Sequence, residues 1–368
     1  MSFLQHFAQL PDPRSHINRT YDLLDIVFLT VCAVLSGAEG WKDIEKFGHV
    51  KLAWLRKFRR FEAGIPVDDT IARIIRALDP ERMTQCFIHW VNAMRREQGH
   101  QFVAIDGKTL RHSFNAEPKD ALHAITVWLR EQGLVFCQTE SAGKKNEIQS
   151  VQALIEMLEI ANATVTLDAM HCQKRTAKLI RKRQADYVLC VKDNQKGLHE
   201  ELQWWFEGFG ERLPEGADTF VETDTGHGRI EVRRYTQLPV TEQLTKAAGW
   251  TDARSVIRVE RERHIGEKRT CETVYYISSH APNAAFIAEA IRSHWEVENK
   301  AHWVLDVVYR EDDCRIRRGN GAFNVGLVRR LCMNLARLHP VKDSVRGKLK
   351  DAAWDDDFRE QLLFGIND

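Results

Sequence analysis

Three short strand-like segments that begin near Gln101, followed by alternating helix and strand, restrict the fold of this chain more than any other feature of its sequence. Short apolar and β-branched runs predict the strands, and a stripe of apolar residues at helical spacing predicts the helix between the third and the fourth. A basic helix is expected before the fifth strand. The predicted order is β-β-β-α-β-α-β, with strands at 102–106, 124–129, 134–137, 163–168 and 187–191. This order predicts an α/β domain.

Two of these strands end in an aspartate, and the order of the segments brings the two acids together. The order is that of a ribonuclease H-like core, in which the first and fourth strands are neighbours. Asp106 ends the first strand and Asp168 ends the fourth, and the interval of 62 residues between them holds two strands and one helix. Since a buried carboxylate is costly unless it is paired or bound to a metal, we expect the two acids to share one metal site. For either acid alone, an ordinary aspartate at a turn is the alternative.

A third acid is expected from a helix late in the chain. Glu298 shares one helix face with aromatic and apolar residues and is therefore expected to point into the protein. Glu296 and Asp306 are rival candidates, and a glutamate on the solvent side of the helix is the alternative. The residues of the shared face are His294, Trp295, Glu298, His302 and Leu305.

Three carboxylates in this arrangement predict a site for a hard divalent cation. Mg²⁺ prefers oxygen ligands and keeps water and phosphate oxygens in its shell, and Mn²⁺ can substitute for it. Two such ions about 3.5–4 Å apart activate a water or a 3′-hydroxyl and stabilise the leaving oxygen of a phosphoryl displacement. Nucleic acid is then the expected substrate class.

The charge of the chain is balanced overall but concentrated locally. With 53 Lys and Arg against 52 Asp and Glu, the formal net charge is +1, which excludes a globally basic polyanion-binding protein. Residues 169–197 nonetheless carry eight basic and two acidic residues, and residues 314–337 carry six arginines and no acid. Both runs flank the expected metal site, which favours DNA contacts over a merely solvated face. The candidate contacts in these runs are Lys174, Arg175, Lys178 and Arg315.

The remaining segments predict three divisions of the chain. Residues 1–97 are expected to form an all-helical accessory domain with a candidate DNA-binding role, and residues 98–340 the catalytic α/β domain. Alternating β-branched runs with a glycine-containing turn predict a strand-rich insertion over 215–280. Residues 341–368, with five basic and seven acidic side chains, are expected to form a polar, partly disordered tail.

The cysteines and the N-terminus disfavour several other classes of protein. No two of the eight cysteines form a C-x-x-C pair, which argues against a zinc ribbon and a thioredoxin-type redox site. His171-Cys172 lacks a suitably spaced second soft ligand, which argues against a transition-metal site. The longest apolar run, Ile26–Leu35, has half the length needed to span a bilayer, and no signal peptide is recognisable. We therefore expect no membrane association.

Several ordered stretches match a known family. They are PDPR from Pro11, GIPVDDT from Gly64, 104–109 (AIDGKT), 166–171 (TLDAMH), 187–195 (YVLCVKDNQ), His227-Gly228-Arg229 with Glu231, and 294–306 (HWEVENKAHWVLD). On these stretches the chain resembles bacterial insertion-sequence transposases of the DDE type, most closely the H-repeat-associated branch that lies near Rhs elements. The resemblance extends over nearly the whole chain, up to about Pro340.

The resemblance implies an activity and the roles of three residues. Asp106, Asp168 and Glu298 would be the first, second and third metal-binding acids of a transposase that cuts element ends and transfers the 3′-hydroxyls to target DNA. In relatives the strand-rich insertion helps to hold the transposon end. The resemblance further implies double-stranded DNA as the partner, a homodimer on paired ends, and a cytoplasmic bacterial protein that is nucleoid-associated when bound.

One departure concerns the Tyr, Arg, Glu, Lys signature that many relatives carry around the third acid. The Tyr place holds Ile291, the Arg place His294 and the Lys place Leu305, although Arg292 and Lys300 lie nearby as substitutes. The absent Arg and Lys favour one alternative, an inactive remnant that only binds DNA. A structure-selective nuclease that shares the fold is a further alternative. The further candidate DNA contacts are Arg229, Arg292, His294, Trp295 and Lys300.

Overall fold

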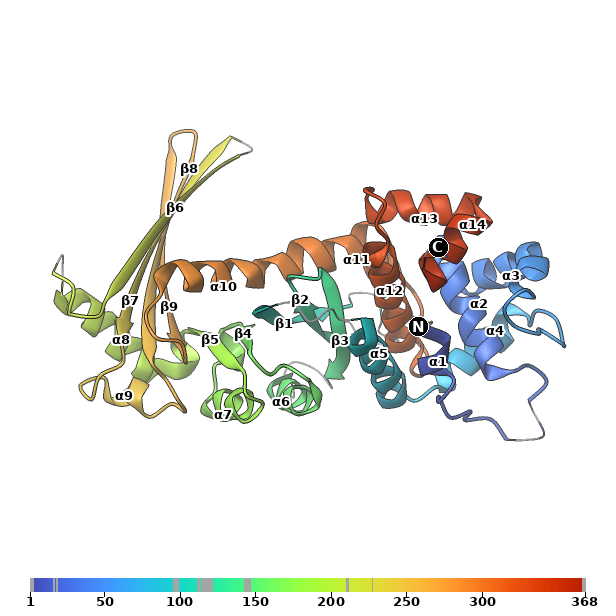
Figure 1. Ribbon diagram of the computed structural model, residues 1–368, viewed down its shortest axis with the longest axis horizontal. Coiled ribbons are helices and arrows are strands. Elements are labelled where there is room, and N and C mark those ends of the chain that lie inside the picture. The colour runs from blue at the N-terminus through green and yellow to red at the C-terminus, as the bar shows by residue number, and fades with distance from the viewer. Residues whose placement is uncertain are drawn as a thin grey trace. The chain divides into compact units, whose positions relative to one another are not determined.

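The chain is assembled from two units, and each unit combines separated parts of the sequence. Our computed structural model describes residues 3–15, 17, 19–94, 99–110, 113, 122–141, 147–209, 212–226 and 228–365. Unit 1 comprises Met1–Glu97, Gly107–Glu147 and Glu298–Asp368, and unit 2 comprises Gln98–Asp106 and Ile148–Val297. Figure 1 shows the elements of both units along the chain.

Unit 2 contains a sheet that changes from parallel to antiparallel pairing. Its strands are β1 (Gln101–Thr109, which continues into unit 1), β4 (Ala163–Leu167), β5 (Asp186–Val191), β6 (Asp218–Gly226), β7 (Arg229–Pro239), β8 (Ser255–Ile265) and β9 (Lys268–Ser278). Pairing is parallel from β1 to β4 to β5 and antiparallel beyond β5, in the order β1-β4-β5-β9-β8-β7-β6. The β-branched runs expected over 215–280 thus form four long strands that extend the parallel sheet.

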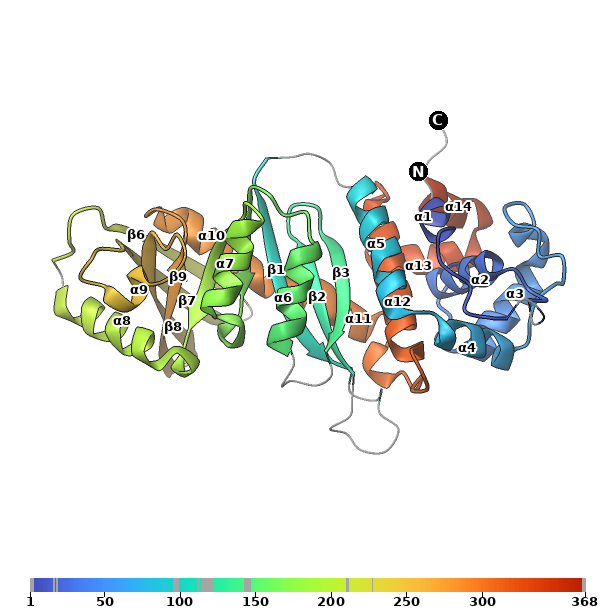
Figure 2. The same cartoon turned by 90° about the horizontal axis from the view of Figure 1, so that it is seen from below.

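Helices cover both faces of the parallel strands in unit 2. Two views show α7 (Lys174–Lys182) on one face and α10 (Ala284–Glu296) on the other (Figures 1 and 2). Asn283 caps the start of α10, because its side chain accepts a bond from the Phe286 backbone N–H. On the α10 face, Phe102, Val188 and Cys190 belong to one apolar cluster with residues of α10. The other helices between β3 and α10 are α6 (Glu147–Met157), α8 (Lys196–Phe209) and α9 (Thr245–Ala248).

Unit 1 is mostly helical, as predicted for its N-terminal part. Its helices include α1 (Phe3–Phe7), α2 (Leu23–Leu35), α3 (Trp41–Leu55), α4 (Asp68–Ala77), α5 (Pro80–Met94), α11 (Trp303–Val307) and α12 (Gly321–Leu338). The hairpin β2 (His123–Leu129) and β3 (Leu134–Ser141) forms as expected, and the sheet order there is β3-β2-β1. Among the described residues, no helix combines the length and the apolar character needed to cross a bilayer.

The late helix α12 is the centre of unit 1, which the sequence did not reveal. It contacts α2, α4, α5 and β3, elements that come about 200–300 residues earlier in the chain. The Asn324 side chain donates to the backbone oxygens of Ile75 and Leu78, at 2.8 and 3.0 Å. Asn334 exchanges two bonds with the backbone of Val135, at 2.9 and 2.7 Å. Polar residues of α12 therefore bond early backbone groups inside the core.

The prediction of a partly disordered tail is wrong. Residues Val345–Trp354 and Asp356–Phe364 form helices α13 and α14, each begun by a capping side chain, Ser344 and Asp355. The Arg359 guanidinium lies 4.0 Å from the centre of the Trp54 ring and is buried. The polar composition concealed two helices that bury apolar residues such as Leu349 and Leu362 within unit 1 and also bury the charged side chains of Lys348 and Arg359.

Candidate functional site

The strand register places Asp106 and Asp168 at adjacent positions. Ile105 pairs with Leu167 across the parallel strands β1 and β4, and each aspartate is the next residue. Parallel strands lie about 4.8 Å apart, and residues two apart on a strand share one face. Because Thr166 contacts α10, Asp168 and its neighbour Asp106 both project on the α10 face. Asp168 directly follows β4, whereas Asp106 lies within β1, which continues to Thr109 beyond the predicted strand end. This pair of acids, with the side chains around it, is the acid site.

Two histidines accompany Asp168 in unit 2. The half-exposed Asp168 carboxylate lies 3.8 Å from Nε2 of buried His171. On the other side, Nδ1 of His294 lies 3.2 Å from the Thr166 hydroxyl. Burial lowers the pKa of His294 to about 4, although the nearby Asp168 opposes this shift. His294 is therefore a neutral imidazole at physiological pH, held against β4 by the Thr166 hydroxyl.

The segment after β5 is bonded to the loop that carries Asp168. Asn194 Nδ2 donates to the backbone oxygen of Ala169 at 2.7 Å. Gln195 Nε2 donates to the backbone oxygen of Cys172 at 2.9 Å and to the side chain of Gln173 at 3.2 Å. Both residues fix the start of that loop relative to β5. Sequence reasoning missed them, although polar residues directly after a buried strand were the available signal.

Glu298 lies where the late helix changes its geometry. Helix α10 ends at Glu296, and Val297–His302 form a π-helix, η6, before α11. The wider turn of a π-helix breaks the 3.6-residue spacing that predicted an inward-facing Glu298. Glu298 is instead exposed, as the first residue of the C-terminal part of unit 1. The rival Asp306 is ion-paired with Lys108, and the rival Glu296 is half-buried.

The candidate DNA-contacting cations have different environments. Helix α7 buries its apolar side and leaves Lys174, Arg175 and Lys178 exposed in one row. Arg292 is exposed but ion-paired with Glu222 at 2.9 Å. Trp295 is 47% exposed and lies against the Arg261 guanidinium, whereas Lys300 and Arg315 are exposed and Arg229 is half-buried. His227 of the predicted motif lies outside the described residues.

The second basic run does not form a single DNA-facing surface. Arg329 and Arg330 are buried, and Arg330 donates to the fully buried Glu311 at 2.7 Å. The Arg337 guanidinium lies 4.6 Å from the centre of the Trp128 ring. These arginines pair or pack within unit 1, so counting charges along the sequence overstated the surface charge of the run.

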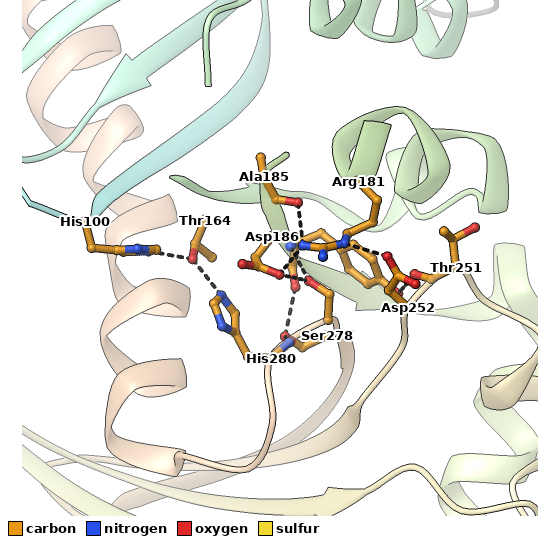
Figure 3. Close-up of polar contacts among 11 residues, drawn as sticks. His100, Thr164, Arg181, Ala185, Asp186, Thr251, Asp252, Ser278 and His280 are labelled. Carbon is orange, nitrogen blue, oxygen red and sulfur yellow. Dashed lines mark hydrogen bonds and ion pairs between the residues drawn. The ribbon is translucent and has the colours of Figure 1, made fainter. Parts of the chain in front are cut away.

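The opposite edge of the same strands carries a second polar cluster (Figure 3). The Thr164 hydroxyl lies 2.7 Å from Nε2 of both His100 and His280. Arg181 forms ion pairs with Asp186 and Asp252, and the Ser279 hydroxyl donates to Asp186 at 2.7 Å. Burial lowers the pKa of His280. Side chains at this amino edge thus bond one another.

The acid site suits a hard cation in its chemistry. Within the described ranges, no three His, Cys, Asp or Glu side chains are grouped in a way that could hold a metal ion. The two adjacent carboxylates nevertheless supply oxygen donors that reach solvent on one face of the sheet. Oxygen donors and room for water are what Mg²⁺ requires.

Comparison with known proteins identifies relatives over the whole chain. A family model described as "Transposase DDE domain" matches residues 97–335, and one described as "DDE_Tnp_1-associated" matches residues 4–91. The "H repeat-associated putative transposase YhhI" of Escherichia coli is 38% identical over 369 residues, covering 98% of this chain and 97% of its own. The "Inactive transposase YbfQ" of Escherichia coli is 50% identical over 72 residues, which cover 20% of this chain and 86% of that protein.

A solved structure titled as a piggyBac transposase synaptic complex with hairpin DNA aligns with 97% of this chain and 77% of its own. Its TM-score is 0.44 and its sequence identity 13%.

Proposed function

We propose, given that this chain belongs to the DDE transposase family and resembles its H repeat-associated members, that it cuts DNA at the ends of an insertion element. It then transfers the 3′-hydroxyl ends to target DNA. The observation that carries this proposal is the adjacent placement of Asp106 and Asp168 on one face of the sheet. Two acids side by side on neighbouring parallel strands could hold the metal ions that phosphoryl chemistry uses.

The proposed fold of the catalytic part is a ribonuclease H-like core. The strand order β3-β2-β1 in unit 1 and β1-β4-β5 in unit 2 supports it, because β1 is shared by both series. The antiparallel pair β2 and β3 followed by parallel β4 and β5 also supports it. In this proposal residues 1–97 serve as the accessory domain and residues 98–340 as the transposase domain.

Asp106, Asp168 and Glu298 would hold Mg²⁺, with Mn²⁺ as a substitute. When bound, the metal lowers the pKa of the attacking water or hydroxyl and stabilises charge on the leaving oxygen. The position of Glu298 in a π-helix agrees with this role, because single π-turns in helices are frequent at functional sites. His171 stays beside the Asp168 carboxylate and restricts its orientation.

The basic residues would bind double-stranded DNA around the acid site. The exposed row Lys174, Arg175 and Lys178 lies on the helix that follows the Asp168 loop, so its charges can meet the phosphate backbone. Trp295, a residue of α10 that lies against Arg261, offers an exposed aromatic surface. Arg229, Arg292, His294, Lys300 and Arg315 are the other proposed contacts. We propose a homodimer on paired element ends, located in the cytoplasm and on the nucleoid when bound.

The test is strand cleavage by variants of the paired acids. Purified wild type, Asp106→Asn and Asp168→Asn are incubated with Mg²⁺ and a duplex that carries the DNA flanking the reading frame. Cleavage is expected to fall at least 1000-fold in both variants, while the melting temperature and DNA binding are retained. The control is Asp193→Asn, an almost fully exposed aspartate after β5, which should cleave like wild type. Undiminished cleavage by Asp168→Asn contradicts the proposal.

An inactive remnant that only binds DNA is the second candidate. It is favoured by the neutral His294 and the apolar Leu305 at the places of the signature Arg and Lys. In that case wild type binds the duplex and yields no metal-dependent product. A structure-selective nuclease would instead cut with no dependence on the sequence of the ends.

A further inference from the structure

We infer that Lys192, the residue directly after β5, contacts a phosphate of the DNA strand held at Asp106 and Asp168. This inference rests on the proposed function and adds a substrate-contacting residue to it. Lys192 lies in the stretch YVLCVKDNQ. This stretch contains neither Asp106 nor Asp168 and lies outside helix α7, so the proposed function assigns no role to it.

The register places Lys192 beside the acid site. Leu167 pairs with Leu189 across β4 and β5, so Asp168 lies level with Cys190, and Lys192 follows two residues farther along. The Cα atoms of Asp168 and Lys192 are therefore separated by about one strand spacing of 4.8 Å across and about 6.6 Å along the sheet. This offset is within reach of the four-carbon lysine side chain and a phosphate between the two groups.

Lys192 projects on the same face of the sheet as the acids. Val188 and Cys190 pack in the cluster with α10, and the backbone of Lys192 is still extended. Alternation along the strand then directs Lys192 to the α10 face, where Asp168 also projects. The Cys190 thiol between them supports this placement. Burial raises its pKa to about 11, and among the nearby charges Lys192 and Arg261 lower that pKa whereas Asp168 and Glu272 raise it.

The segment that carries Lys192 is held in place. Asn194 and Gln195, two and three residues later, donate to the backbone oxygens of Ala169 and Cys172 in the Asp168 loop. These bonds tie the ends of β4 and β5 together. The position of Lys192 relative to Asp168 is thus fixed at its base, while its side chain remains exposed.

Among the described residues Lys192 has no acidic partner, in contrast to Arg292 and Arg261 of the same unit. Within the part of the chain that the structure describes, no ion pair involves Lys192. Arg292 is paired with Glu222, and Arg261 lies between Trp295 and Glu272. A lysine ammonium that keeps all its donors for solvent can bind a non-bridging phosphate oxygen as a point charge. It would supply the positive charge that His294 and Leu305 do not provide.

The experiment measures DNA affinity as a function of salt for Lys192→Ala, Lys192→Arg and the matched control Lys196→Ala. Lys196 is exposed, four residues farther along at the start of α8. Fluorescence anisotropy uses a labelled duplex of the flanking DNA with Mg²⁺ present. We expect Lys192→Ala to bind about tenfold more weakly, with the slope of log K against log salt reduced by about 0.9. Lys192→Arg should restore both values, and Lys196→Ala should match wild type.

Cleavage of the same duplex gives a second readout. Single-turnover cleavage by Lys192→Ala is expected to be about 100-fold slower than wild type at saturating protein, with partial recovery in Lys192→Arg. Equal losses of affinity in Lys192→Ala and Lys196→Ala, or none in either, overturn the inference. If wild type cleaves nothing, the proposed activity fails, but the salt dependence still decides whether Lys192 contacts phosphate.

Discussion

The parallel strands β1, β4 and β5 differ sharply between their two edges. At the amino edge, Thr164, Arg181 and Asp186 bond neighbouring side chains in a closed network (Figure 3). At the carboxyl edge, Asp168 keeps half of its side chain in solvent, and Lys192 is exposed. The same strands thus use polar groups for stability at one edge and leave them accessible at the other.

The largest expected contrast in stability is between two aspartates at opposite edges. In Asp186→Ala, Arg181 and Ser279 lose their shared acceptor, and the free energy of unfolding should fall by about 2–3 kcal/mol. In Asp168→Ala, a half-exposed carboxylate is lost, and the free energy of unfolding should change by less than about 0.5 kcal/mol. Urea unfolding followed by circular dichroism measures both values. Equal losses would remove the distinction between the edges.

A second prediction concerns acid stability at the carboxyl edge. The pKa of His294 in the folded chain is about 4, below the usual value of 6.5. Between pH 4 and pH 6.5, His294 is therefore protonated in the unfolded chain but neutral in the folded chain. The free energy of unfolding is therefore unaffected by His294 above pH 6.5 and falls as the pH is lowered from 6.5 towards 4. The loss is at most about 1.4 kcal/mol per pH unit, because a single imidazole binds at most one more proton in the unfolded chain than in the native chain.

The measurement compares urea unfolding of wild type and His294→Asn at pH 7 and pH 5. Wild type should lose up to about 2 kcal/mol more than the variant over this range. The same pH dependence in both proteins would show that His294 is not the group responsible.

The smallest expected difference separates two threonines on one face of β4. Thr164 bonds two imidazoles, at the amino edge, whereas Thr166 bonds only His294, at 3.2 Å. Thr164→Val should lower the free energy of unfolding by about 1–2 kcal/mol, and Thr166→Val by about 1 kcal/mol. Thermal unfolding of the two variants ranks them. A larger loss in Thr166→Val would reverse the assignment of the structural network to the amino edge.

The sequence predicted the strands better than it predicted what surrounds them. The apolar runs before Asp106 and Asp168 form strands as predicted, because strand alternation is a local property, although β1 continues past Asp106 to Thr109. The orientation of Glu298 was not predictable from a 3.6-residue period, since the π-helix that follows α10 changes that period. Lys192 was missed because its relation to Asp168 depends on the register of β4 with β5, which no local pattern encodes.

Tertiary contacts explain the other differences. The arginines of α12 were counted as surface charge, but Arg330 pairs with Glu311 in a buried site formed by residues far from its own helix turn. Likewise, Asn324 bonds the backbone at Ile75, about 250 residues earlier. Such pairings depend on which distant segments pack together, so composition and spacing along the chain do not specify them.

The most direct test of the difference between the edges is calorimetric titration of Mn²⁺ with the flanking duplex present. It compares wild type, Asp168→Asn at the carboxyl edge and Asp186→Asn at the amino edge. If the acid site holds the metal, binding should be lost in Asp168→Asn and kept in Asp186→Asn. Unchanged metal binding in Asp168→Asn, or equal loss in both variants, would contradict the account.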